Sequence, residues 1–307
     1  MTQPTTIDMT FDTSLVDVKP PTIDANTSFS TVESDQANTS TVQPRPQVPI
    51  HHIPTQDAYN QWASQYDSDG NMLQAIDDIE LAAFLPTFLS QIPNPNPSIS
   101  SSSSSESPLH ILDLGCGTGR NTLKLLRHFT QTPAPSQSRT KIIGIDFSPA
   151  MLTIAHSKLS PYPPETWDLH CCDIFSSPPS SLPIPAVHAV LSTLVLEHIP
   201  LSNFFSTLSS LLLPSGVALI TNMHHEMGRL GGQAGFVSQQ GVKVRGRSFL
   251  HKVDEVLEKA AESGFEVLGV REREVRRGDL DGGVVGGRGE KWVGVRVWMG
   301  VLVRRVG

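Results

Sequence analysis

Cysteine is scarce in this sequence. Only three of the 307 residues are cysteines, Cys116, Cys171 and Cys172, and their spacing matches neither a disulfide framework nor a zinc site. Because a bond between the adjacent Cys171 and Cys172 is sterically awkward, we expect three small buried thiols in a reducing compartment.

Long apolar runs and targeting signals are also lacking. No run approaches the length of a membrane helix. The N-terminus has no charged-then-apolar signal sequence, and its aspartates exclude an arginine-rich transit peptide. These absences predict a cytoplasmic protein that does not bind a membrane.

Positive charge is in deficit. Lys and Arg total 23 against 30 Asp and Glu, which gives a net charge of -7 and a pI near 5.9. The arginine-rich stretch 271–277 is interleaved with acids and predicts a solvated strand face. Because phosphate binding needs a basic face, we expect no nucleic-acid partner.

Low hydrophobic content (38%) and charged content (17%) predict long unstructured segments. Residues 1–50 are interpreted as a disordered Ser/Thr/Pro-rich tail. The domain then covers 51–307, with a helical lid at 51–92. We expect loop insertions in three polar or Gly-rich segments, at 93–108, 131–139 and 278–290.

Strand and helix patterns alternate through the domain. Apolar runs predict strands at 111–114, 141–146, 167–172, 188–194, 216–223, 265–275 and 291–303. Helices are predicted at 121–129, 148–159, 201–212 and 251–264. The pattern predicts an α/β, Rossmann-like, doubly wound sheet of seven mostly parallel strands. The last two strands have no helix between them, so we expect an antiparallel hairpin at the C-terminal edge.

A glycine-rich turn follows the first strand. The sequence GCGTGR places Gly115, Cys116, Gly117 and Gly119 where backbone atoms can approach a ligand. Arg120 stands where a dinucleotide fingerprint needs its third glycine, and the Gly-Lys-Ser/Thr of a P-loop is absent. The carboxylate of Asp113 would repel a pyrophosphate and suits an ammonium group.

Acids also end the next two strands. Asp146 can accept two hydrogen bonds from a ribose diol, and Phe147 can cover an adenine face. Asp173 can accept from an adenine amino group. A lone acid is more often a helix cap or a solvated loop residue. Three at successive strand ends indicate a ligand with an amine, a ribose and an adenine but no phosphate.

These stretches resemble a known family. LDLGCGTGR, GIDFSPAMLTIA, CCDIF and LSTLVLEHI resemble the motifs of class I S-adenosylmethionine-dependent methyltransferases over 109–223. The lead-in YNQWASQYDSDGN resembles that of fungal and bacterial small-molecule members. One departure is His188, at a strand start where the family usually has an acid.

The resemblance implies S-adenosyl-L-methionine as the cofactor. Asp113, Gly115 and Gly117 would border its methionine end, and its carboxylate would lie at the helix after Gly119. By the same resemblance Asp146 would bind the ribose, with Phe147 and Asp173 at the adenine. No metal is expected.

Candidate general bases follow the fourth and fifth strands. They are Glu197 and His198 after the fourth strand, and His224, His225 and Glu226 after the fifth. His198 is also consistent with a packing role at a helix start. His224 lies where the family places acceptor-facing residues, and His251 is interpreted as a helix N-terminal residue.

An aromatic stripe precedes the sheet. Tyr59, Trp62 and Tyr66 share one face of a helix, which is typical of core packing. In related enzymes this helix closes over the cofactor, and aromatic faces suit a sulfonium cation. We expect Tyr59 or Tyr66 to contact the cofactor and Trp62 to lie in the core.

The sequence therefore predicts methyl transfer to an O, N, S or C atom of a small organic molecule, in specialised metabolism. The alternatives are a protein acceptor, or a catalytically inactive cofactor-binding partner or regulator.

Overall fold

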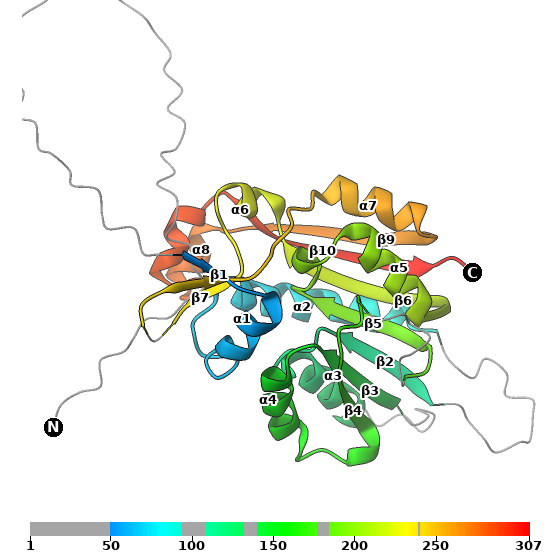
Figure 1. Cartoon of the computed structure of the whole chain (residues 1–307). Helices are drawn as coiled ribbons and strands as arrows, with labels where there is room; N and C mark the ends of the chain where they lie inside the picture. Colours follow the sequence, from blue (N-terminus) through cyan, green and yellow to red (C-terminus); the bar gives the residue numbers. More distant parts are fainter. Residues whose placement is uncertain (1–49, 94–107, 132–139, 177–183, 239) are drawn as a thin grey trace, which may run out of the picture.

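A seven-stranded sheet forms the centre of the molecule (Figure 1). The computed structural model describes residues 50–93, 108–131, 140–176, 184–238 and 240–307. The predicted tail 1–50 and the loops 93–108 and 131–139 lie almost wholly outside these residues. Within the described residues, no helix has both the length and the apolar character needed to cross a membrane.

The strand order is β4-β3-β2-β5-β6-β10-β9. The five strands from β4 to β6 in this order pair in parallel, and β10 is antiparallel to both β6 and β9. The predicted mostly parallel sheet with an antiparallel C-terminal edge is therefore confirmed. The strands are β2 (Leu109–Leu114), β3 (Thr140–Asp146), β4 (Trp167–Cys171), β5 (Val187–Thr193), β6 (Leu212–Met223), β9 (Phe265–Glu274) and β10 (Arg296–Arg305).

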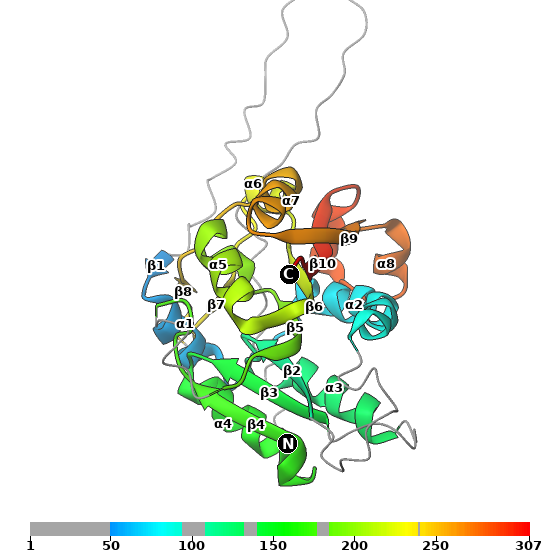
Figure 2. The same cartoon turned by 90° about the vertical axis from the view of Figure 1, so that its right-hand side faces the viewer.

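Helices cover both faces of the sheet, and α2 and α5 lie on opposite sides of β5 and β6 (Figure 2). On one face are α2 (Met72–Gln91), α3 (Arg120–Gln131) and α4 (Pro149–Leu159). On the other are α5 (Leu201–Leu211) and α7 (Val253–Glu262). Successive strand residues alternate between the two faces, so Ile111 joins one core cluster and Leu112 the other.

Two residues of the sequence define the start of α4. The hydroxyl of Ser148 accepts a hydrogen bond from the amide of Met151 at 3.2 Å, and Pro149 opens the helix. This arrangement caps free N–H groups in the first turn, as the sequence predicts. The capped helix begins three residues after the last residue of β3.

A second, three-stranded sheet joins distant parts of the chain. β1 (Ile50–His52) pairs with β8 (Lys243–Arg245), which pairs with β7 (Gly235–Val237). Beside it lies α1 (Thr55–Trp62), and α6 (His225–Arg229) precedes β7 along the chain. This sheet was not predicted, because each of its strands has only three residues and little apolar alternation.

The described residues correct three expectations. The segment 278–290 is not a plain loop, since it contains most of α8 (Arg277–Asp281) and part of the 3-10 helix η4 (Gly287–Trp292). Cys116 is buried, but Cys171 is exposed. Within 51–92, α2 packs on β6 and β10 as a covering helix, with Leu81 and Phe88 fully buried. A covering position over the cavity is therefore left to β1, α1 and the turns after α1, where Tyr66 lies.

Candidate active site

The three glycines of the turn after β2 differ in what an added side chain would meet. All three have positive φ, +74° at Gly115, +53° at Gly117 and +77° at Gly119. A Cβ atom on Gly115 would lie 2.2 Å from a methyl carbon of Val195, and one on Gly119 would lie 3.1 Å from Ala155. A Cβ on Gly117 would meet nothing within 4 Å. Packing therefore requires two of the glycines, and the third faces open space.

Asp146 holds this turn in place. Its Oδ2 accepts from the amide of Gly117 at 2.9 Å, and its Oδ1 accepts from the amide of Ser148 at 2.8 Å. Burial raises the pKa of the carboxyl to about 6, although the backbone hydrogen bonds act in the opposite direction. The acid that ends β3 thus positions the backbone that ends β2.

These residues form one side of a cavity of about 390 Å³ at the C-terminal ends of the parallel strands. This is where ligands bind in open α/β sheets, and the volume falls in the range of small-molecule sites. The other walls come from α1, from the segments after β4 and β5, and from residues 247–249.

The structure brings together eight of the residues singled out in the sequence. Those that line the cavity are Gly115, Gly117, Asp146, Phe147, Asp173, Tyr59, Tyr66 and His198. Four others do not line it, namely Asp113, Cys116, Gly119 and His224.

Asp113 and Cys116 lie behind the glycine turn. One carboxylate oxygen of Asp113 accepts from the hydroxyl of Thr122 at 2.6 Å, and the other is buried without a hydrogen-bond partner in the described structure. Burial raises the pKa of Asp113 to about 6 and that of the Cys116 thiol well above its ordinary value. Asp113 therefore supports the turn and does not form the cavity wall.

Asp173 is in the cavity wall at the start of a tight turn after β4. Its Oδ1 accepts from the amides of Phe175 (3.1 Å) and Ser176 (3.2 Å), and its Oδ2 accepts from the Ser176 hydroxyl at 2.6 Å. The turn thus orients this carboxylate.

His198 connects three segments of the wall. It ends the 3-10 helix η3 (Leu196–His198), and its Nδ1 lies 2.7 Å from the carbonyl oxygen of Arg247. Because a carbonyl oxygen can only accept, Nδ1 carries the proton, and Nε2 accepts from the Tyr59 hydroxyl at 2.8 Å. Burial lowers the pKa of His198 and raises that of Tyr59. The pair is therefore a neutral imidazole and a neutral phenol.

Glu197, the other candidate base after the fourth strand, is next to this pair. Its side chain is 3% exposed, its Oε1 is 3.6 Å from Nε2 of His198, and its Oε2 has no hydrogen-bond partner in the described structure. Burial raises the pKa of Glu197 to about 8, so the carboxyl is protonated at neutral pH. In the sequence, Glu197 is the acid of the stretch LVLEHI.

His224 lies away from the cavity, which corrects its assignment as an acceptor-facing base. The residue is fully buried, and its Nδ1 accepts from the amide of Glu226 to cap α6. Its Nε2 then carries the proton and donates to Glu272 on β9 at 2.7 Å. Glu226 in turn pairs with Arg296. With both ring nitrogens bonded inside the protein, His224 has a structural role.

The aromatic stripe divides between the cavity and the core, and its residues do not share one helix as predicted, because α1 ends at Trp62 and Tyr66 lies in the turns that follow. Tyr59 and Tyr66 line the cavity, with ring centroids 6.0 Å apart. Trp62 is 2% exposed, donates to Asp69 at 2.7 Å and stacks on Phe236. The prediction that Trp62 lies in the core is confirmed.

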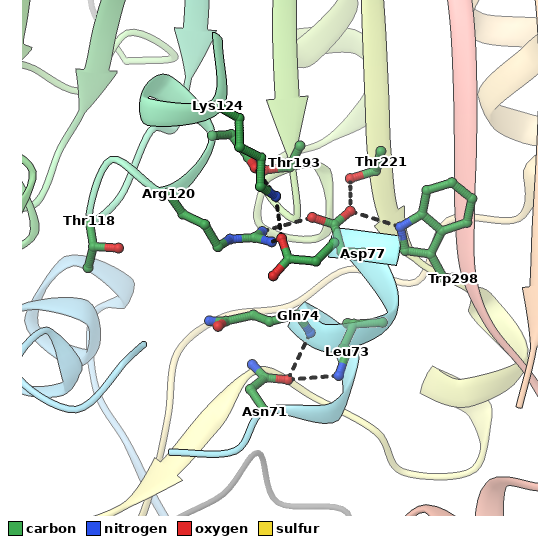
Figure 3. A network of polar contacts seen from close by, with 12 residues as sticks. Asn71, Leu73, Gln74, Asp77, Thr118, Arg120, Lys124, Thr193, Thr221 and Trp298 are labelled. Carbon is green, nitrogen blue, oxygen red and sulfur yellow. Dashed lines mark hydrogen bonds and ion pairs between the residues drawn. The ribbon is translucent and has the colours of Figure 1, made fainter. Parts of the chain in front are cut away.

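A buried polar network behind the cavity is centred on Asp77 of α2 (Figure 3). Asp77 accepts from Arg120 at 2.8 Å, from Thr221 at 2.6 Å and from the Trp298 indole at 2.9 Å. Arg120 also pairs with Asp78. Arg120, which replaces the third glycine of a dinucleotide fingerprint, thus ties the helix after the glycine turn to α2. In the sequence, the only indication of this network was the pair of acids Asp77 and Asp78 within the otherwise apolar stretch 72–91.

Comparisons with known proteins agree with this geometry. The family model of a methyltransferase domain matches residues 111–216. A protein of Emericella nidulans, named as an uncharacterized methyltransferase, is 41% identical over 270 residues, which cover 82% of this chain and 91% of that relative.

The fold is also that of a solved methyltransferase. The geranyl diphosphate C-methyltransferase of Streptomyces coelicolor, in complex with S-adenosyl-L-homocysteine, matches with a TM-score of 0.51 at 13% identity. The match covers 73% of this chain and 76% of that one. At this identity the likeness is one of fold.

Proposed function

Because the chain belongs to the S-adenosylmethionine-dependent methyltransferases, we propose that it methylates an O, N, S or C atom of a small organic molecule. The observation that carries the proposal is that the cavity is lined both by the glycine turn and by the Tyr59–His198 pair. One cavity is thus lined by seven of the predicted cofactor-binding residues and by a candidate base.

The residues present fit S-adenosylmethionine. A side chain on Gly117 would project into open space, so its absence leaves room for a ligand against the backbone. Asp146, Phe147 and Asp173 line the same cavity, as the family pattern requires of ribose- and adenine-binding residues. When bound, the cofactor supplies an electrophilic methyl group on a cationic sulfur.

The protein's own part is to align the acceptor and, where the acceptor is protonated, to remove its proton. Nε2 of His198 is unprotonated, and its lone pair accepts the hydrogen bond from the Tyr59 hydroxyl. A proton of the acceptor can pass to the Tyr59 oxygen while the Tyr59 proton passes to Nε2. The imidazolium so formed keeps its Nδ1 hydrogen bond to the Arg247 carbonyl and lies beside Glu197.

A small acceptor fits this cavity better than a protein side chain on an intact surface. Residues of α1 together with Arg247 and Phe249 form part of its wall, and its volume is that of a small-molecule site. A role in specialised metabolism is part of the proposal and rests on the resemblance to fungal and bacterial small-molecule members.

The test is a methyl-transfer screen with labelled donor and the full-length protein. We expect label in small molecules, and we expect His198→Gln to lower the turnover rate at saturating donor while S-adenosylhomocysteine affinity is retained. Label in proteins alone would contradict a small-molecule acceptor. Cofactor binding without transfer to any acceptor would favour the inactive partner, and calorimetric heat with NAD but not with S-adenosylhomocysteine would overturn the assignment altogether.

A further inference from the structure

One cation in the cavity wall is unpaired. Arg247 lines the cavity and is exposed, and no hydrogen bond or ion pair to its guanidinium is present among the described residues. Its side chain instead lies over the ring of Phe249, with 4.7 Å between the guanidinium carbon and the ring centroid. The chain has a net charge of -7, so a positive group at a ligand cavity stands out. Such a group attracts an anionic ligand electrostatically.

Both backbone groups of Arg247 are anchored. Its amide donates to the hydroxyl of Thr55 in α1 at 3.1 Å, and its carbonyl accepts from Nδ1 of His198 at 2.7 Å. The amide of Phe249 donates to the carbonyl of Glu197 at 2.6 Å. Because the backbone and the aromatic platform are both fixed, the guanidinium is preorganised, which lowers the entropy lost on binding an anion.

The other acidic and basic side chains of the wall already have hydrogen-bond partners within the protein. Both oxygens of Asp146 accept backbone amides, and both oxygens of Asp173 accept hydrogen bonds within its own turn. Both nitrogens of His198 are bonded as well. Arg247 is therefore the charged group of the wall that has donors left for a ligand.

We propose that Arg247 selects an acceptor that carries a carboxylate or a similar oxyanion. This inference rests on the proposed function and adds a substrate class to it. The planar guanidinium matches a two-oxygen anion with two parallel N–H···O bonds, which neither a neutral amide nor an ester can accept equally well. The anion then lies at the wall formed by 247–249, next to the Tyr59–His198 pair.

The test compares matched pairs of acids and amides on the S-adenosylhomocysteine-saturated protein. Calorimetry with hydroxybenzoates, hydroxycinnamates and aliphatic hydroxy acids, each beside its carboxamide, measures the acid preference. We expect at least one acid to bind about tenfold or more tightly than its amide. Arg247→Ala should abolish that preference, and Arg247→Lys should keep part of it. Arg277→Ala, which removes an exposed cation outside the cavity wall, is the matched control and should change nothing.

A second measurement excludes the cofactor's own carboxylate as the anion. S-adenosylhomocysteine has this carboxylate and 5′-methylthioadenosine does not. We expect Arg247→Ala to leave the affinity for both nucleosides unchanged. A selective loss of S-adenosylhomocysteine affinity would overturn the proposal, as would the absence of any acid preference across the panel or its persistence in Arg247→Ala. If the wild-type protein binds neither nucleoside, it is the proposed function that fails.

Discussion

The amide of Gly117 donates to the Oδ2 of Asp146 over 2.9 Å, across the ends of two adjacent parallel strands. This bond joins the middle of the glycine turn to the acid that ends β3. Its partner bond from the Ser148 amide, at 2.8 Å, ties the same carboxylate to the start of α4. The glycine turn, the Asp146 carboxylate and the start of α4 are thus positioned as one unit. A substitution at Gly117 therefore tests the wall of the cavity.

We expect Gly117→Ala to weaken S-adenosylhomocysteine binding by about tenfold or more while the fold persists. The added Cβ would meet no protein atom within 4 Å and would occupy ligand space. A left-handed alanine also costs about 1 kcal/mol of stability. Gly241→Ala is the matched control, since Gly241 has a φ of +75° and equally open surroundings outside the cavity wall. Calorimetry and melting curves compare the two variants. Equal affinities would mean that the Gly117 position is purely structural.

The aromatic stripe should separate into two classes of variant. Trp62→Ala should lower the free energy of unfolding by about 3–5 kcal/mol with or without ligand, because the side chain is 2% exposed. Tyr59→Ala or Tyr66→Ala should reduce the thermal shift that S-adenosylhomocysteine produces, since a ligand stabilises in proportion to its affinity for the folded state. Melting curves of the three variants with and without ligand measure this. Identical ligand-induced shifts would leave all three as core residues.

Asp77 and Asp78 provide a matched pair for the network behind the cavity. The Asp77 side chain is fully buried, and Asp77→Ala should cost about 3–5 kcal/mol because it leaves the Arg120 charge and two donors poorly compensated. The Asp78 side chain is 45% exposed, and Asp78→Ala should cost at most about 1 kcal/mol. Urea unfolding gives both values. A similar cost for the two variants would show that Asp77 does not hold α2 to the sheet.

The free energy of unfolding should depend on pH through the ionisation of Glu197. Its pKa is about 8 in the folded chain against an ordinary value of 4.5, so the folded chain keeps a proton that the unfolded chain has lost. Rising pH then favours unfolding between those two values. Asp113 and Asp146, with pKa values of about 6, contribute mainly below pH 6.5. Buried histidines such as His198, whose pKa is lowered, act in the opposite direction near pH 6.5. We therefore expect the free energy of unfolding of the wild-type protein, relative to that of a variant without the Glu197 carboxyl, to fall by about 2 kcal/mol from pH 6.5 to 8.

The control for this prediction is Glu197→Gln, which keeps the shape of the side chain and cannot ionise. Its unfolding free energy should not fall from pH 6.5 to 8, because the buried histidines with lowered pKa gain stability as pH rises. Urea denaturation at each pH measures the difference between the two proteins. A variant that loses stability as steeply as the wild-type protein would assign the slope to another group.

The comparison of sequence and structure is informative at single residues. The glycine turn, Asp146 and Asp173 could be found in the sequence because each follows a strand directly, and parallel strands end at one edge of the sheet. His224 follows a strand in the same way, yet its ring turns to Glu272 and away from the cavity. Position along the chain predicted the strand end, but it did not predict the direction of the side chain.

The sequence by itself determined the seven-stranded sheet and its antiparallel edge, because the spacing of apolar residues is a local property that predicts strands and helices. The glycine turn and the motifs that resemble the family likewise identified the cofactor. Only the tertiary structure decided the acceptor side of the cavity. There β1 pairs with β8 from 193 residues away, the Tyr59 hydroxyl bonds His198, and the Arg247 amide bonds Thr55. These contacts join short segments without periodic pattern, and each depends on how the packed sheet brings distant backbone together.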